Sequence, residues 1–197
     1  MTRERPAPSP LILASASPRR RALLRALGLR YRVIVPTVEE AHHDGLPPAR
    51  LVRHNARLKA EAVAAGLRAG IVLAADTLVV LDGRLFGKPR DAAAAARMLR
   101  RLSGRTHVVY TGVCLVDARR GRRFSGVAAT RVAIRRLSDA EIRRYVRDAA
   151  PMDKAGAYAV QHWDRMIVDR VEGSLSNVIG LPLHLVEEGL RRLGVTP

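Results

Sequence analysis

The chain has few cysteines, few aromatic residues and no long apolar segment. Cys114 is the single cysteine in 197 residues, which excludes an internal disulfide and favours a reducing compartment. No apolar run approaches the about 20 residues that span a bilayer, and the first residues lack the apolar core of a secretory signal. We therefore expect a cytoplasmic protein without a membrane segment, with residues 1–9 as a flexible tail and residues 10–197 as one domain.

Acidic residues are scarce, because 18 Asp and Glu stand against 35 Lys and Arg and leave a net charge of +17. A surplus of this size attracts polyanions. The basic residues are spread over every segment, however, and two Phe and one Trp offer few rings on which bases could stack. No zinc-finger or RNA-recognition signature is present. The composition favours a solvated basic surface, with nonspecific nucleic-acid binding at most, over a dedicated nucleic-acid site.

The stretch from residue 11 to residue 24 joins a predicted buried strand to a predicted helix. Its first four residues are apolar, and Ser17 followed by Pro18 is typical of a helix N-terminus. Arg19 and Arg20 come next. The free N–H groups and the dipole of a helix N-terminus attract anions, and arginine adds bidentate phosphate contacts. The stretch predicts a phosphate site, and the alternative is a surface helix that is basic because the chain is rich in arginine.

A carboxylate interrupts the most apolar predicted strand, residues 71–81. Asp76 and Thr77 are the polar residues inside the segment IVLAADTLVVL. Burying a carboxylate without a partner costs free energy, and buried ionisable groups concentrate at working sites. We therefore predict a functional role for Asp76 in preference to a structural one.

Candidate metal ligands lie in the loop after the predicted strand 31–35. Glu39 and Glu40 offer carboxylate oxygens, which magnesium prefers. The adjacent His42 and His43 are possible ligands for a transition metal, although such a cluster is more often a solvated loop. The carboxylates are the better candidates.

Two of the three lysines in the chain occur in segments rich in small residues. Lys88 lies between a glycine and a proline on a restrained loop, where its amine could reach a phosphate. The segment 153–161, DKAGAYAVQ, contains Lys154, Tyr158 and Gln161. Its small residues allow the backbone to approach a ligand, and the Gln161 amide can read the edge of a base because it both donates and accepts. A turn leading into a strand is the alternative for this segment.

Hydrophobic periodicity, helix caps and turn residues divide the whole chain into short elements. In the second predicted helix we expect Leu51, Leu58 and Ala62 on the inner face, with Asn55 and Lys59 on an adjacent face. The predicted strands are 11–14, 31–35, 71–81, 84–86, 106–116, 124–135 and 166–171, the predicted helices are 18–27, 48–67, 92–102, 138–146 and 182–194, and 172–177 is a predicted polar turn.

Six segments along the chain resemble the Maf family of nucleotide pyrophosphatases over about residues 11–190. No single segment is specific for the family, but the six in their order are. The segments are LASASPRR at 13–20, AADTLVV at 74–80, GKPRDAAAAARML at 87–99, LSGRTHVVYTGV at 102–113, DKAGAYAVQ at 153–161 and EGSLSNVIGLPL at 172–183.

The resemblance implies an enzyme that hydrolyses a nucleoside triphosphate to the monophosphate and pyrophosphate. It implies a mixed α/β fold in which an elongated, twisted, mixed sheet is flanked by helices and a nucleotide cleft lies between two lobes. A divalent metal, Mg²⁺ or Mn²⁺, and a homodimer are expected. DKAGAY followed by Gln161 resembles the branch of the family that acts on dTTP and UTP.

The resemblance also assigns roles to individual residues. It makes Asp76 the proton acceptor, with Glu40 and Asp76 holding the metal and Lys88 joining them as a catalytic residue. It links Arg19, Thr77 and Gln161 to the choice of substrate. The residues expected to contact the substrate are Ser17, Arg19, Arg20, Lys59, Thr77, Asp153, Lys154 and Gln161.

The chain departs from the family pattern after Gln161, where His162 and Trp163 stand in place of the more usual glycine. This leaves the base preference open, and 7-methyl-GTP or another non-canonical nucleotide is the alternative substrate. A protein of another class is also an alternative: a nucleic-acid-binding or septum-inhibiting regulator that uses the basic surface.

Overall fold

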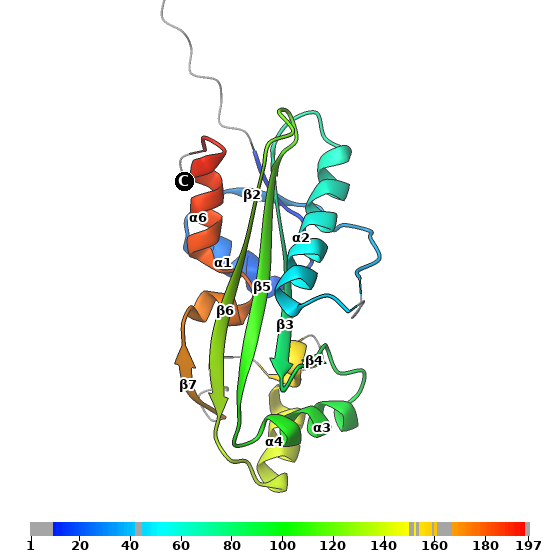
Figure 1. Ribbon diagram of the computed structural model, residues 1–197, viewed down its shortest axis with the longest axis vertical. Helices are drawn as coiled ribbons and strands as arrows, with labels where there is room; N and C mark the ends of the chain where they lie inside the picture. Colours follow the sequence, from blue (N-terminus) through cyan, green and yellow to red (C-terminus); the bar gives the residue numbers. More distant parts are fainter. Residues whose placement is uncertain are drawn as a thin grey trace, which may run out of the picture.

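The computed structural model describes residues 10–41, 45–149, 152, 154–158, 160 and 167–195 (Figure 1). In that part of the chain, no helix is both long and apolar enough to cross a bilayer. Several sequence predictions fall outside it: the tail 1–9, the pair His42 and His43, and the residues Asp153, Gln161, His162 and Trp163.

A seven-stranded mixed sheet runs along the length of the molecule (Figure 1). The strand order is β2-β1-β3-β5-β6-β7, and β4 pairs with the far end of β3. Strand β1 is parallel to β2 and β3, and the other pairs are antiparallel. The strands are β1 (Leu11–Leu13), β2 (Tyr31–Val33), β3 (Ile71–Leu81), β4 (Arg84–Phe86), β5 (Thr106–Asp117), β6 (Arg123–Ile134) and β7 (Val168–Glu172).

Helices cover the sheet in two groups, one at each end of the molecule (Figure 1). At one end α2 lies on one face while α1 and α6 lie on the other; α3 and α4 pack together at the opposite end. The predicted mixed α/β fold with an elongated sheet and two lobes is confirmed. The helices are α1 (Pro18–Ala26), α2 (Pro48–Ala65), α3 (Ala92–Leu102), α4 (Asp139–Ala149), the 3₁₀ helix η2 (Ala155–Ala157), α5 (Leu175–Ile179) and α6 (Leu183–Arg192).

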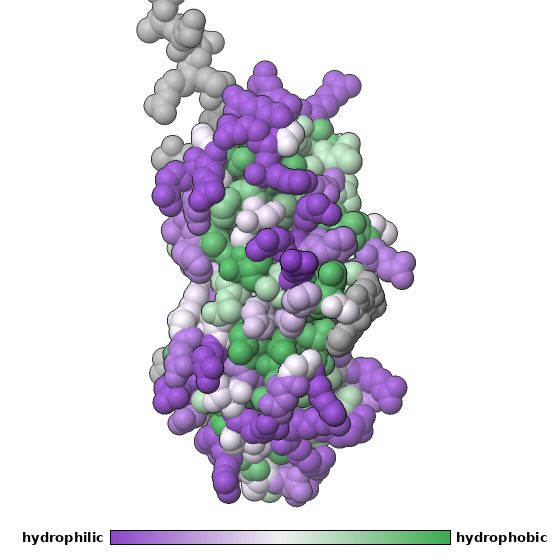
Figure 2. Space-filling view, viewed as in Figure 1, coloured by the Kyte–Doolittle hydropathy of each residue, from purple (hydrophilic) through white to green (hydrophobic). Residues whose placement is uncertain are grey.

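Strand alternation sends the side chains of β3 to two different cores. Leu73 packs in the core that includes Leu24 of α1 and Leu190 of α6, whereas Val72 packs in the core that includes Ala60 of α2. A third core fills the other lobe, between α3, α4 and the far ends of the long strands. Polar surface gathers at the two ends of the molecule and more apolar surface shows at its middle (Figure 2).

Strand β3 has a gap along one edge. Its neighbour β1 ends at Leu13, which pairs with Leu73, and β4 begins to pair only at Val79. Between these points, residues 74–78 have no strand partner on that side in the described part of the chain, while β5 pairs with them on the other side. A gap of this kind lets side chains from both faces of β3 reach one space.

The prediction for the inner face of α2 is confirmed for Leu51 and wrong for Leu58 and Ala62. Ala62 is exposed and Leu58 is half-buried, whereas Asn55 and Lys59 are buried with Leu51. The hydrophobic pattern alone places polar residues away from a core. Here the two polar side chains are buried because they bind a buried carboxylate on β3.

The predicted polar turn at 172–177 was also wrong, because a short helix, α5, occupies part of it. Ser174 caps this helix by accepting a hydrogen bond from the backbone N–H of Asn177 (3.2 Å), and Gly180 ends it with φ of 113°. The Asn177 side chain is buried and donates to Val109 O (3.1 Å) and Thr130 Oγ1 (2.9 Å). Turn residues are also cap residues, so local composition did not separate the two structures.

Other departures are smaller. Helix α4 continues to Ala149, beyond the predicted end at residue 146, and β2 ends at Val33, before the predicted end at residue 35. In the segment 153–161, Ala155–Ala157 form η2, and Gly156 there has φ of 73°. A positive φ of this size suits glycine.

His107 of β5 is buried in the third core, with 1% of its surface exposed. Its Nε2 lies 2.5 Å from the Tyr158 hydroxyl, and its Nδ1 is buried without a hydrogen-bond partner in the described residues. Burial disfavours the charged imidazolium and lowers the pKa of His107 to about 4.

We expect His107 to make the fold less stable in mild acid. The unfolded chain takes up a proton on this histidine below about pH 6.5, but the folded chain does so only at about pH 4. The unfolded state therefore binds more protons between these values, and the free energy of unfolding should fall by about 2 kcal/mol between pH 6.5 and 4.5 from this group. Urea titrations of wild type and His107→Leu should show this difference in pH dependence; equal slopes would contradict it.

Candidate functional site

A cavity of about 680 Å³ lies at the gap in the edge of β3, between the two lobes. The loop from β1 to α1, the loop after β2, one face of α2, the loop after β4, the segment around η2, and the end of α5 all contribute to its wall. The predicted site residues that line it are Ser17, Arg19, Arg20, Glu40, Lys59, Asp76, Thr77, Lys88 and Lys154. Glu39, the other candidate carboxylate, is exposed and is not part of the cavity wall.

Asp76 lies on the α2 face of β3, and α2 supplies its partners. Lys59 Nζ is 2.8 Å from Asp76 Oδ1, and Asn55 Nδ2 donates to Asp76 Oδ2 at 3.2 Å. Lys59 Nζ is also 3.0 Å from Glu40 Oε1. One ammonium therefore bridges a buried and a half-exposed carboxylate, and the group keeps a net charge of about −1 when all three are ionised.

Asn55 also holds the loop that carries Glu40. Its Oδ1 accepts from the backbone N–H of Ala41 (2.9 Å), and its Nδ2 donates to the Ala41 carbonyl (3.1 Å). A single buried amide thus connects the loop after β2 with the carboxylate of Asp76. Asn55 was not among the predicted site residues; its position four residues before Lys59 places both on one helical face.

Gly112 allows α2 to lie this close to the sheet. It pairs with Asp76 across the β3–β5 ladder, so its missing side chain would point to the same face. A Cβ at Gly112 would lie 2.3 Å from Val52 O and 2.7 Å from Arg53 N, both in the backbone of α2. The close approach of helix and strand therefore requires glycine at this position.

On the opposite face of β3, Arg20 connects three elements. Its Nε donates to Gly180 O (2.8 Å), its Nη1 to Ser15 Oγ (3.2 Å) and its Nη2 to Thr77 Oγ1 (3.2 Å). Thr77 Oγ1 lies 3.1 Å from Thr111 Oγ1 on β5. Burial lowers the pKa of Arg20, and the nearby charge of Asp76 partly offsets this. Arg20 therefore organises the wall of the cavity, with two of its five N–H groups not used in these contacts.

The N-terminus of α1 opens into the cavity as expected. Ser17 Oγ accepts from the backbone N–H of Arg20 at 3.5 Å, and Pro18 occupies the first turn. Arg19 and Lys154 are half-buried in the wall, whereas Lys88 is exposed on the loop after β4. The hydroxyl of Ser15 accepts hydrogen bonds from Arg20 Nη1 and from the backbone N–H of Ser17. Ser15 is the second site residue that the sequence predictions missed.

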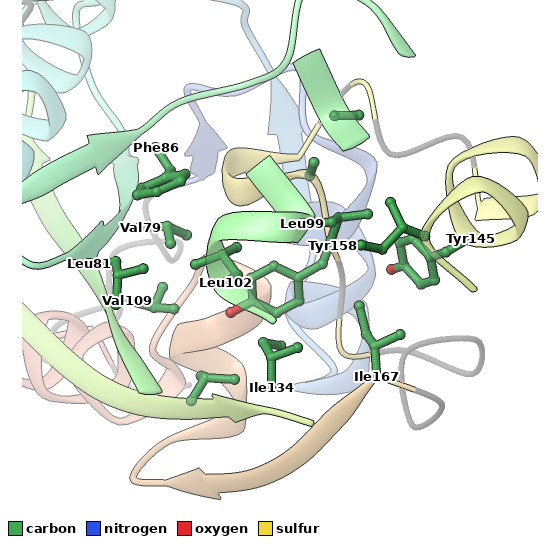
Figure 3. Close-up of a cluster of buried hydrophobic side chains, with 14 residues drawn as sticks. Val79, Leu81, Phe86, Leu99, Leu102, Val109, Ile134, Tyr145, Tyr158 and Ile167 are labelled. Atoms are coloured by element: carbon green, nitrogen blue, oxygen red, sulfur yellow. The ribbon is translucent and has the colours of Figure 1, made fainter. Parts of the chain in front are cut away.

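Part of the cavity wall is apolar and consists of Val79, Val109, Tyr158, Val160 and Val178. Val79, Val109 and Tyr158 belong to the same buried cluster, drawn in Figure 3. The wall thus combines cationic side chains, which suit anions, with an apolar part that suits a flat, uncharged ring.

The carboxylates fit a divalent cation only in part. In the described part of the chain, no third Asp, Glu, His or Cys joins Glu40 and Asp76 in a group that could hold a metal. Magnesium commonly takes one or two protein carboxylates and completes its shell with water and substrate phosphates. Glu40 and Asp76 fit a metal that arrives with a phosphate ligand.

Comparison with known proteins adds a family and relatives. A family model described as "Maf-like protein" matches residues 10–193. The chain is 52% identical over 187 residues to the dTTP/UTP pyrophosphatase of Moorella thermoacetica, covering 95% of this chain and 96% of that protein. It is 47% identical over 184 residues to the protein of the same name from Pelotomaculum thermopropionicum, covering 93% and 96% of the two chains.

Proposed function

The chain belongs to the Maf family, and from this premise we propose that it hydrolyses nucleoside triphosphates, dTTP and UTP in particular, to the monophosphate and pyrophosphate. Relatives that carry the name dTTP/UTP pyrophosphatase match over nearly their full length. The observation that carries the proposal is the cavity around Asp76, whose wall holds both cationic and apolar side chains. The cationic side chains suit a triphosphate, and the apolar part of the wall suits a base.

Asp76 is the proposed base. A water molecule attacks the α-phosphorus, the bond from that phosphorus to the bridging oxygen breaks, and pyrophosphate leaves. Asp76 accepts a proton from the water as the new P–O bond forms. Asn55 orients this carboxylate through its contact at 3.2 Å, so that its geometry exists before substrate binds. Lys59 also contacts the carboxylate, at 2.8 Å, before substrate enters.

The cationic side chains are proposed to hold the phosphates. Arg19, Lys88 and Lys154 line the cavity, and the N-terminus of α1 adds backbone N–H groups. Ser17 and the remaining N–H groups of Arg20 complete the phosphate-binding set. Charge on the transferred phosphoryl group and on pyrophosphate is thereby neutralised as it develops.

A divalent metal, Mg²⁺ or Mn²⁺, would be held by Glu40 and Asp76. When bound, it would neutralise phosphate charge and polarise the attacking water. Lys59 now bridges these two carboxylates, and we propose that its ammonium turns to a phosphate oxygen when substrate and metal enter. This agrees with its expected role as a phosphate ligand.

Further assignments follow from the family resemblance. We propose that Arg19, Thr77 and Gln161 take part in the choice of base and that Asp153 completes the cleft. A homodimer is proposed on the same basis, and a cytoplasmic location is proposed because the chain has a single cysteine. Gln161 and Asp153 lie outside the described residues.

A panel of triphosphates tests the proposed function. We expect release of pyrophosphate from dTTP and UTP in the presence of Mg²⁺ or Mn²⁺, and loss of release when the metal is chelated. Ranking dTTP, UTP, CTP, 7-methyl-GTP and inosine triphosphate by kcat/KM identifies the preferred base. Preference for 7-methyl-GTP would keep the chemistry and reject the pyrimidine assignment, and no pyrophosphate from any member would reject the proposed function.

A further inference from the structure

His107 contacts the cavity wall from the core side and takes no part in the proposed reaction. It is on β5, five residues before Gly112, and its side chain points into the third core. The one hydrogen-bond partner of its side chain among the described residues is the hydroxyl of Tyr158, at 2.5 Å. The two rings also meet edge to face, with their centroids 5.2 Å apart. His107 is therefore tied to one residue of the cavity wall by two kinds of contact.

Burying a histidine at this position costs free energy. Its Nδ1 has no partner in the described residues, and an unpaired buried polar atom destabilises the fold. Leucine or phenylalanine would fill the volume without that cost. What histidine adds to an apolar residue here is the hydrogen bond to Tyr158.

The ring of Tyr158 is held on another side by the backbone of η2. A Cβ at Gly156 would lie 3.3 Å from Tyr158 Cε1 and 3.2 Å from Val79 Cγ2, so a side chain there would crowd the ring, and the φ of 73° also favours glycine. Tyr158 itself is 5% exposed and lines the cavity. Gly156 limits where the ring can lie, and His107 holds its hydroxyl end.

We propose that His107 is a positioning residue for the nucleoside: by holding the Tyr158 hydroxyl, it fixes the aromatic wall against which the base packs. The inference rests on the proposed function, because it needs a nucleotide whose phosphates are held by the cationic side chains of the cavity.

Four variants test this. His107→Leu fills the space without a hydrogen bond, and Tyr158→Phe keeps the ring but removes the hydroxyl. His107→Gln keeps a group that can bond the hydroxyl and should rescue. Tyr145→Phe is the matched control, because Tyr145 is another buried tyrosine of the same core that does not line the cavity.

We expect His107→Leu and Tyr158→Phe each to raise KM for dTTP about tenfold with kcat within about twofold, the size of one weakened base–aromatic contact. The double variant should be no worse than either single variant, because both remove the same bond. His107→Gln and Tyr145→Phe should retain KM near the wild-type value. Additive effects, or a fall in kcat at constant KM, would overturn the inference. If His107→Leu does not fold, Tyr158→Phe and His107→Gln carry the same comparison.

Binding measurements separate this inference from the proposed function. Calorimetry with the α,β-imido analogue of dTTP, and with inorganic tripolyphosphate as a probe without a base, requires no turnover. His107→Leu should weaken binding of the analogue about tenfold and binding of tripolyphosphate by less than about twofold. If both probes bind more weakly by the same factor, or if neither affinity changes, the positioning role is rejected. A wild type that binds the analogue but hydrolyses no triphosphate rejects the proposed function instead.

Discussion

Asp76→Asn is expected to lower kcat for dTTP by about 10²- to 10⁴-fold, the usual contribution of a general base. The amide is close in shape to the carboxylate but cannot accept the proton of the attacking water. It also replaces one of two proposed metal-binding carboxylates, but higher metal concentrations should not restore activity because the proton acceptor itself is missing. Lys59 keeps Glu40 as a partner at 3.0 Å, so the ammonium is not left unpaired. Single-turnover release of pyrophosphate measures the loss.

Asp117→Asn is the matched control for this variant. Asp117 is also a buried aspartate in the sheet, 4% exposed, but it lies at the end of β5 and accepts from the backbone N–H groups of Arg119 and Arg120. It does not line the cavity. Asp117→Asn should therefore cost stability and leave kcat near the wild-type value. Wild-type kcat in Asp76→Asn would show that another group accepts the proton.

Gly112→Ala is expected to damage both the fold and the site. The added Cβ would lie 2.3 Å from Val52 O, and backbone cannot turn away as a side chain can. Overpacking of this kind typically costs about 1–3 kcal/mol. Because α2 must move from the sheet, Lys59 and Asn55 should lose their contacts with Asp76, and kcat should fall together with stability.

Gly126→Ala is the control for Gly112→Ala. Gly126 is on the neighbouring strand β6, but an added Cβ there would meet the ends of the Leu185 side chain at 3.0 and 3.2 Å, which can adjust. Urea unfolding and kcat should both change less than in Gly112→Ala. Similar losses in the two alanine variants would show that the distance between α2 and β5 does not control the site.

Local chemistry predicted much of the fold. Ser17 caps α1 as expected, and Asp91 caps α3 in the same way, with each side chain accepting from the backbone N–H group three residues on. Ser138 and Glu141 form a capping box, and the Asp82–Gly83 turn joins β3 to β4. These features depend on residues close in the chain, and the sequence shows all of their partners at once.

The errors arose where distant residues decide the structure. Asn55 and Lys59 are buried because Asp76 lies opposite them, and α5 is held by bonds from Asn177 to β5 and β6. Asp76 could be predicted as functional from its apolar neighbours alone. Asn55, Ser15 and Gly112 could not, since each acts through a partner that only the folded chain brings near.

The gap in β3 also bears on how the chain avoids aggregation. An unpaired strand edge offers backbone groups to the strands of other molecules, and proteins usually shorten or cover such edges. Here the edge between Leu73 and Val79 is about five residues long and lies within a cavity walled by α1, α2 and η2. A bound nucleotide would cover it further. Removing β1 or β4 from their places would lengthen this edge, so the two short strands protect the chain from self-association as well as framing its site.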